Sequence, residues 1–129
     1  MSRVVLDASA LIAMLKNTPG ADAVAAAIVS ADIGVINYAE VVSHFIHLGM
    51  PAGDVDDMLD PLPMVIIPAD KLLARDAGRL RAATASAGLS LGDRFCLALA
   101  RREGLPAWTA DKAWAAIADA VGVETVIIR

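Results

Sequence analysis

Short apolar runs alternate along this chain with longer segments of helical character. The first run, Val4 to Leu6, stops at a carboxylate, Asp7, and residues 8–15 continue with the composition of a helix. This pattern predicts a buried strand that leads directly into a helix. Asp7 is therefore expected at the carboxyl end of a strand, where ligand crevices form in open α/β sheets. The simpler interpretation is that Asp7, or Ser9 after it, only caps the helix.

The same alternation continues to the end of the chain. Four further strands are predicted at short apolar segments: 34–36, 64–67, 107–109 and 125–128. Helices are predicted between them, most of them closed by glycine or proline: 21–31, 38–48, 51–60, 69–87, 90–103 and 111–120. Strands that alternate with helices imply a parallel sheet covered on both faces.

Composition limits the classes of protein to consider. The chain has 129 residues, 57% of them hydrophobic, and a mean hydropathy of +0.60. No apolar run approaches the ~20 residues that a membrane span needs, and Asp7 interrupts the first run too early for a secretory signal. The one cysteine, Cys96, cannot form an internal disulfide, in agreement with a reducing compartment. We expect a single cytoplasmic domain over residues 1–129.

Three more acids stand where a predicted strand or loop turns into a helix: Glu40, Asp93 and Asp111. Each has a modest explanation by itself. Asn37 with Glu40 resembles a capping box, Ser90 with Asp93 resembles a looser one, and Asp111 suits the dipole of the helix after it.

Taken together, these helix-start acids suggest chemistry. Helices that follow parallel strands begin at one edge of the sheet, so the four carboxylates can converge there. Without a counter-ion, their repulsion would force at least one to take up a proton. Oxygen ligands at one concave site suit Mg²⁺ or Mn²⁺, and one or two such ions, roughly 3.5 to 4 Å apart, support phosphodiester hydrolysis. The residues alone leave this interpretation and four unrelated helix caps equally open.

Four segments, in order and over nearly the whole chain, carry a family resemblance: VVLDASALIAML, NYAEVV, SLGDRFCLALA and TADKAW. They supply an opening D-x-S, a central A-E, a G-D-x-x-x-A segment and a T-x-D, which are jointly specific although each is weak. With them the chain resembles PIN-domain ribonucleases and, more narrowly, the VapC-type toxins of bacterial toxin–antitoxin pairs.

This resemblance implies a three-layer α/β/α fold with a central parallel sheet of four to five short strands, and a Mg²⁺- or Mn²⁺-dependent endoribonuclease. It also implies an antitoxin that blocks the crevice, and we expect a homodimer formed through apolar helical faces. By position, two acids would be the main metal ligands and two would complete the set: Asp7 and Asp93, then Glu40 and Asp111. The hydroxyls of Ser9 and Thr109 would orient ligands or water. Gly92, where many relatives have a larger residue, would widen the crevice.

The charge of the chain bears on an RNA partner. The net charge is −4, which at face value disfavours nucleic acid. Setting the four candidate acids aside, however, leaves 11 acidic residues beside 11 Lys and Arg. Arg94 and Lys112 lie near the candidate site in sequence and are the candidate phosphate contacts.

Other residues have ordinary explanations. Glu40, His44 and His47 form one helical stripe that lacks the soft third ligand of a histidine metal site, so the histidines are read as surface or boundary residues. Cys96 and Trp114 follow apolar patterns and are predicted in the core, as is Trp108, which lies in a predicted strand.

Two other functions remain open. The first is a haloacid-dehalogenase-like phosphohydrolase with Asp7 as nucleophile, although that class has a second Asp where this chain has Ser9. The second is a metal-stabilised module that binds RNA or protein without cutting.

Overall fold

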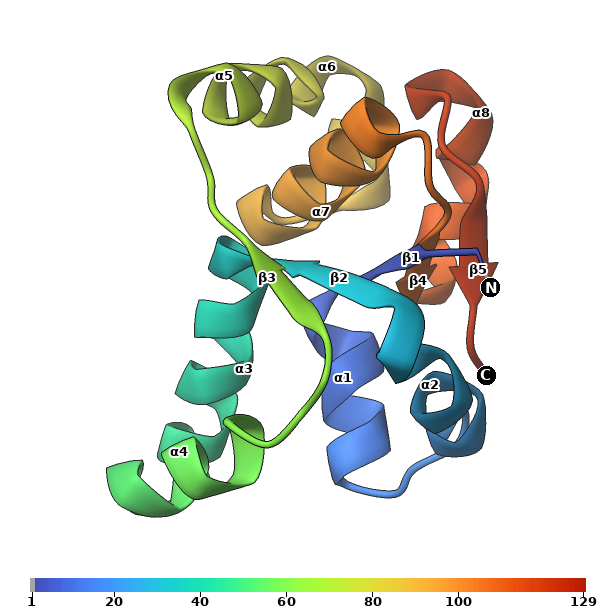
Figure 1. Ribbon diagram of the computed structural model, residues 1–129. Helices are drawn as coiled ribbons and strands as arrows, with labels where there is room; N and C mark the ends of the chain where they lie inside the picture. The colour runs from blue at the N-terminus through green and yellow to red at the C-terminus, as the bar shows by residue number, and fades with distance from the viewer. Residues whose placement is uncertain (1) are drawn as a thin grey trace.

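A single all-parallel sheet forms the middle layer of the computed structural model, which describes residues 2–129 (Figure 1). Its five strands are β1 (Val4–Leu6), β2 (Ala31–Gly34), β3 (Val65–Ile67), β4 (Ala107–Thr109) and β5 (Thr125–Ile127). They lie side by side in the order β3-β2-β1-β4-β5. The predicted α/β/α architecture with a parallel sheet is therefore confirmed.

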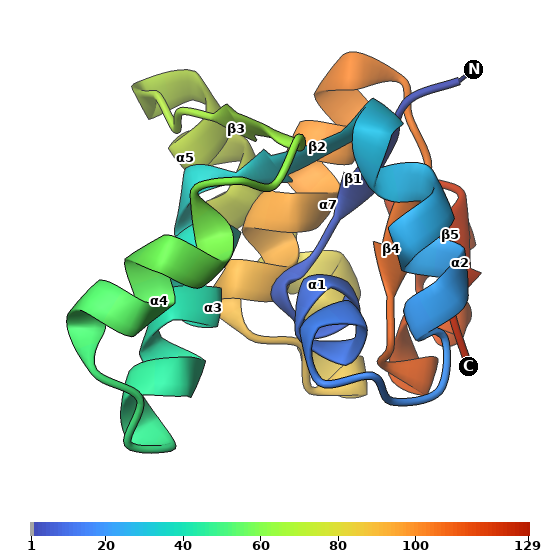
Figure 2. The same cartoon turned by 60° about the horizontal axis from the view of Figure 1, so that its bottom comes forward.

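Helices cover both faces of this sheet (Figures 1 and 2). On one face lie α1 (Ala8–Leu15), α2 (Ala21–Ala27) with the 3₁₀ turn η1 (Ile28–Ser30), α3 (Val35–His47) and α4 (Ala52–Leu59). On the other lie α5 (Lys71–Arg79), α6 (Arg81–Thr84), η2 (Ala85–Ala87), α7 (Leu91–Glu103), η3 (Lys112–Ala116) and α8 (Ala118–Val121). Among residues 2–129, no helix has the length and apolar character needed to span a membrane.

Alternating side chains of the central strand hold the layers together. Val4 and Leu6 pack into the core beneath α1 to α4, whereas Val5 packs into the core beneath α7. Trp114 is fully buried in this second core, as predicted, and Trp108 packs partly buried against the first. Because both faces are covered, β1 is apolar at every position.

The second strand was placed three residues too late by the sequence pattern. The prediction was a strand over 34–36, whereas β2 covers Ala31–Gly34 and α3 already begins at Val35. The helix predicted over 21–31 likewise ends at Ala27 and continues as a 3₁₀ turn. The apolar pattern of β2 is interrupted by Asp32, which is why the strand was missed.

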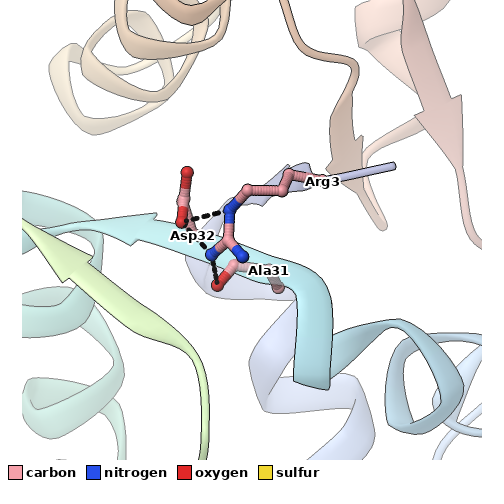
Figure 3. A network of polar contacts seen from close by, with 3 residues as sticks. All are labelled: Arg3, Ala31 and Asp32. Carbon is pink, nitrogen blue, oxygen red and sulfur yellow. Dashed lines mark hydrogen bonds and ion pairs between the residues drawn. The ribbon is translucent and has the colours of Figure 1, made fainter. Parts of the chain in front are cut away.

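An ion pair with a partly exposed arginine makes that carboxylate tolerable inside the sheet (Figure 3). Asp32 is 6% exposed and lies opposite Val5 in the strand register. The guanidinium of Arg3, just before β1, donates from Nε to Asp32 Oδ1 at 3.1 Å and also bonds through Nη2. Nη2 donates in addition to the carbonyl of Ala31 at 3.1 Å.

Two predicted helices are broken. The helix expected over 69–87 divides into α5, α6 and η2, with the first break at Leu80. Thr84 Oγ1 donates to the Leu80 carbonyl at 2.8 Å, a contact that commonly bends helices. The helix expected over 111–120 is the 3₁₀ turn η3 followed by the short α8.

The edge strand β3 pairs only with β2. Its Val65 and Ile66 side chains are 47% and 42% exposed, and Pro63 and Pro68 stand on either side of it. The predicted strand over 64–67 is confirmed within one residue.

Candidate active site

The order of the strands reverses at the centre of the sheet, between β1 and β4. From β1 the chain proceeds to β2 and β3 on one side, while β4 and β5 lie on the other. In parallel α/β sheets, ligands bind at the carboxyl ends of the strands where the order reverses in this way. Asp7 directly follows β1, and its N–H donates to the Trp108 carbonyl at 3.0 Å. Thr109 ends the neighbouring strand β4, so both residues lie at this point.

Asp7 is buried and surrounded by hydrogen-bond donors. Its side chain is 3% exposed, and Oδ1 accepts from the Ala10 N–H at 2.8 Å, which caps α1. Ser9 Oγ lies 2.8 Å from Oδ1 and 2.9 Å from Oδ2, and Thr109 Oγ1 donates to Oδ2 at 2.6 Å. The two hydroxyl oxygens are 3.2 Å apart. Ser9 and Thr109 thus fix the orientation of the Asp7 carboxylate.

Burial dominates the ionisation of Asp7. It raises the pKa of this carboxyl to about 6, although bonds from Thr109, Ala10 and Ser9 pull in the opposite direction. The charge of Asp93 raises the pKa further. Within residues 2–129, no Lys or Arg forms an ion pair with Asp7. At neutral pH the carboxylate is therefore ionised at a cost in stability that a nearby positive charge would offset.

Asp93 brings a second negative charge to the crevice from the first turn of α7. Ser90 caps this helix in a full capping box: the Ser90 N–H donates to Asp93 Oδ2 at 2.8 Å, and the Asp93 N–H donates to Ser90 Oγ at 3.2 Å. The Asp93 charge raises the pKa of Glu40 as well as that of Asp7. Asp93 therefore has two roles: it caps α7, and its charge acts on Asp7 and Glu40.

Glu40 lies directly against the backbone of α7. Burial is the main cause of its raised pKa, and a bond from Asn37 opposes the shift. Asn37 Nδ2 donates to Glu40 Oε1 at 2.9 Å and to the Gly92 carbonyl at 3.0 Å. A Cβ on Gly92 would stand only 2.5 Å from Oε1. The expectation that Gly92 widens the crevice is therefore wrong, because the carboxylate of Glu40 occupies that space.

Asn37 was read from the sequence as a helix cap and proves to link two helices. It is 1% exposed and lies in the first turn of α3, whose N-cap is Gly34. The Asn37–Glu40 spacing was a visible signal, but the contact with Gly92 spans 55 positions and had none.

Asp111 stands apart from the other three acids. Its exposed carboxylate accepts from the Ala113 N–H at 2.9 Å and caps η3. Its own N–H donates to Thr109 Oγ1 at 3.0 Å, so it supports the hydroxyl that holds Asp7. Its side chain lines a hollow of about 580 Å³ together with Ser9 and Lys112.

Arg94, a candidate phosphate contact, is engaged elsewhere. Its Nε donates to Thr84 Oγ1 at 2.9 Å and its Nη2 to the Leu89 carbonyl at 3.0 Å, so it anchors α7 to the α6 segment. Cys96 is fully buried in the core as predicted, and burial, followed by the charges of Asp7 and Asp93, raises the pKa of its thiol. This thiol stays protonated and is not a nucleophile.

A dehalogenase-like mechanism does not suit the surroundings of Asp7. A nucleophilic carboxylate must present a free oxygen to the phosphorus, whereas each Asp7 oxygen accepts bonds from two donors and the side chain is 3% exposed. These contacts hold the Asp7 carboxylate in one orientation.

The donor set fits a hard divalent cation. Within residues 2–129, no three His, Cys, Asp or Glu side chains are arranged to hold an ion as they stand. The chemistry still matches, since Asp7 is buried without a cationic partner among these residues, and the Asp93 charge acts on both Asp7 and Glu40. Hard oxygen donors that repel one another are the ligands that Mg²⁺ and Mn²⁺ neutralise.

The fold and site define an α/β protein with a carboxylate crevice at the switch point of a parallel sheet. The family model of the PIN domain matches residues 4–120. The chain therefore belongs to the PIN domain family.

Solved structures share this fold. A toxin–antitoxin complex from Klebsiella pneumoniae matches with a TM-score of 0.74 and 22% identity, covering 98% of both chains. VapBC2 from Rickettsia felis, bound to a promoter DNA fragment, matches with a TM-score of 0.71 and 16% identity, over 96% of this chain and 97% of that one. VapBC-5 from Mycobacterium tuberculosis matches at 0.60 and 23% identity, over 98% of both. No curated protein matches the sequence itself.

Proposed function

We propose that this PIN domain protein is a metal-dependent endoribonuclease, the toxin of a toxin–antitoxin pair. The observation that carries the proposal is Asp7, a carboxylate 3% exposed at the switch point, without an ion-pair partner among residues 2–129. A buried charge of this kind is retained where a ligand neutralises it.

The residues of the crevice take distinct roles in this proposal. Asp7 and Asp93 would hold Mg²⁺ or Mn²⁺, and Glu40 and Asp111 would complete the acidic set. The ion would polarise a phosphoryl oxygen and lower the pKa of the attacking water. Ser9 and Thr109 keep the Asp7 oxygens in one orientation through the hydroxyl contacts at 2.6 to 2.9 Å.

The partner proposed is a cognate antitoxin that covers the crevice. The solved structures that share the fold include a toxin–antitoxin complex, VapBC2 bound to promoter DNA, and a member of the VapBC family of toxin–antitoxin systems. We extend this arrangement to the present chain, together with a homodimer of the toxin.

Cleavage of a tRNA and rRNA panel tests the proposal. The purified protein should cut RNA with Mg²⁺ or Mn²⁺ and should not cut with a chelator. Asp7→Asn should lower the rate by about 10² to 10⁴, because it removes a ligand charge. Asp57→Asn, an exposed acid of α4, is the matched control and should cut as the parent does.

Two results would overturn the proposal. Undiminished cleavage by Asp7→Asn in chelator would remove the metal mechanism. Tight RNA binding with no cleavage in Mn²⁺ across the panel would identify a binding module instead.

A further inference from the structure

Two hollows meet beside Asp7. The larger, about 580 Å³, lies along β4 and η3, and the smaller, about 290 Å³, lies between α1 and α3. Both are lined by Ser9, Ala110 and Arg129. Because Ser9 Oγ also contacts both Asp7 oxygens, both hollows adjoin the residue that holds the buried carboxylate.

Each hollow contains a cation, and a third stands between them. Lys112 lines the larger hollow, Lys16 lines the smaller, and Arg129 lines both. Arg129 Nε donates to the Ala110 carbonyl at 3.3 Å, which places its guanidinium where the hollows meet. These residues belong to separate parts of the sequence, at the end of α1, the start of η3 and after β5.

The three cations are not used for holding the fold by ion pairs. Within residues 2–129, the ion pairs involve Arg3, Arg79 and Arg102, and none involves Lys16, Lys112 or Arg129. Lys16 Nζ lies 3.5 Å from His44 Nε2. Burial and the Lys16 charge both lower the pKa of His44, so Lys16 supplies the positive charge of that hollow.

We propose that Lys16, Arg129 and Lys112 bind phosphates of one RNA strand that follows the two hollows past Ser9, the residue in contact with Asp7. The assignment rests on the proposed function and adds the path of its substrate. An RNA backbone is repelled by the acids of the crevice and by a net charge of −4, so approach requires local cations. Arg129 can contact a phosphate through two N–H groups, whereas each lysine acts as a point charge.

Binding without cleavage tests the path directly. The probe is a fluorescein-labelled single-stranded RNA of mixed sequence, measured by fluorescence anisotropy with the full chain in EDTA over a range of salt. Lys16→Gln, Lys112→Gln and Arg129→Gln should each weaken binding by roughly threefold to tenfold and reduce the salt slope by about 0.7. Lys16→Arg and Arg129→Lys should keep the slope of the parent.

Lys71→Gln is the matched control. Lys71 is exposed at the start of α5, next to Asp70, whose carboxylate pairs with Arg102 at 3.5 Å. Arg102 lies in the last turn of α7, roughly 14 Å along the helix from Asp93 in the first turn. Binding and salt slope should stay unchanged in this variant.

The outcomes separate this inference from the nuclease proposal. Equal salt slopes in the parent and the three glutamine variants would overturn the phosphate path, whether or not the parent cuts RNA. A loss of RNA binding in Lys71→Gln as large as that in the three glutamine variants would also overturn the phosphate path. The expected pattern of binding, found in a protein that cuts nothing in Mn²⁺, would support the path and remove the nuclease.

Discussion

Two aspartates are buried in neighbouring parts of the same sheet and differ in what neutralises them. Asp32 in β2 is 6% exposed, and Asp7 after β1 is 3% exposed. Asp32 bonds to the guanidinium of Arg3 (Figure 3). Within the described residues 2–129, Asp7 receives only hydroxyl and backbone N–H donors, from Ser9, Thr109 and Ala10.

The difference lies in how the fold compensates each buried charge. A buried carboxylate is strongly disfavoured unless it is paired. The chain itself pairs Asp32, and the result is a strand that tolerates an acid in its middle. Asp7 has hydrogen bonds without a countercharge, and its pKa stands at about 6. The charge that is missing from the sequence at this position is the one that a metal ion would bring.

The largest expected effect is an opposite response to the same substitution. A pKa raised from 3.8 to about 6 corresponds to roughly 3 kcal/mol against the folded state at neutral pH. Asp7→Asn should therefore raise the free energy of unfolding of the metal-free protein by up to about 3 kcal/mol. Asp32→Asn should lower it, because Arg3 loses its partner. Urea unfolding in EDTA measures the free energy of unfolding of both variants. Changes of the same sign in the two variants would contradict the proposed difference between Asp7 and Asp32.

The pH dependence of stability should follow from the same acid. The folded protein binds the Asp7 proton more tightly than the unfolded chain does, so stability falls as pH rises from about 4 through about 6. Most of the roughly 3 kcal/mol should be lost over this window in EDTA. In Asp7→Asn this component should disappear. A parent curve identical to that of the variant, measured by urea unfolding at each pH, would contradict the raised pKa.

Added metal should stabilise the protein through Asp7 and not through Asp32. At a concentration of ten times its dissociation constant, Mn²⁺ should raise the free energy of unfolding of the parent by about 1.4 kcal/mol at neutral pH. Asp32→Asn should retain this gain, since its carboxylate lies with Arg3 away from the crevice. Asp7→Asn should lose it. Thermal melting with and without Mn²⁺ makes the comparison, and an equal gain in Asp7→Asn would place the ion elsewhere.

The smallest effect on stability is expected at Gly92. A Cβ there would stand 2.5 Å from Glu40 Oε1, so Gly92→Ala should displace the Glu40 carboxylate and reduce RNA cleavage by about tenfold. Alanine is more favourable than glycine in a helix by up to about 1 kcal/mol, and this gain offsets the energetic cost of displacing the Glu40 carboxylate. Gly78→Ala in α5, which has open space around its Cβ, should gain that stability and keep full activity. Full cleavage by Gly92→Ala would show that Glu40 has no role.

Local signals in the sequence predicted the parts of the site that depend on neighbouring residues. The apolar run before Asp7 gave β1 and the start of α1 at the observed positions. The Ser90–Asp93 spacing gave the cap of α7, and Thr109 ends β4 as expected. These elements form from contacts within a few positions, so periodicity and capping residues are sufficient to place them.

Contacts between distant residues were not visible in the sequence. Arg3 and Asp32 are 29 positions apart, and without their pairing Asp32 reads as a break in an apolar run. Arg94 looked available for phosphate, but its partner Thr84 comes from another helix. Arg129 and Lys16 were not predicted as phosphate contacts, because only the folded chain brings Arg129 close to Ser9. The partners of these side chains depend on the tertiary structure, which local sequence patterns do not contain.

The outer strand β3 affects how copies of this protein behave in concentrated solution. Its free edge is only three residues long, and Pro63 and Pro68, which lack an N–H, stand just outside it. A neighbouring molecule could add few backbone bonds there despite the exposed Val65 and Ile66. A short edge strand with a proline on each side thus disfavours pairing between the sheets of neighbouring molecules, and with it fibril formation.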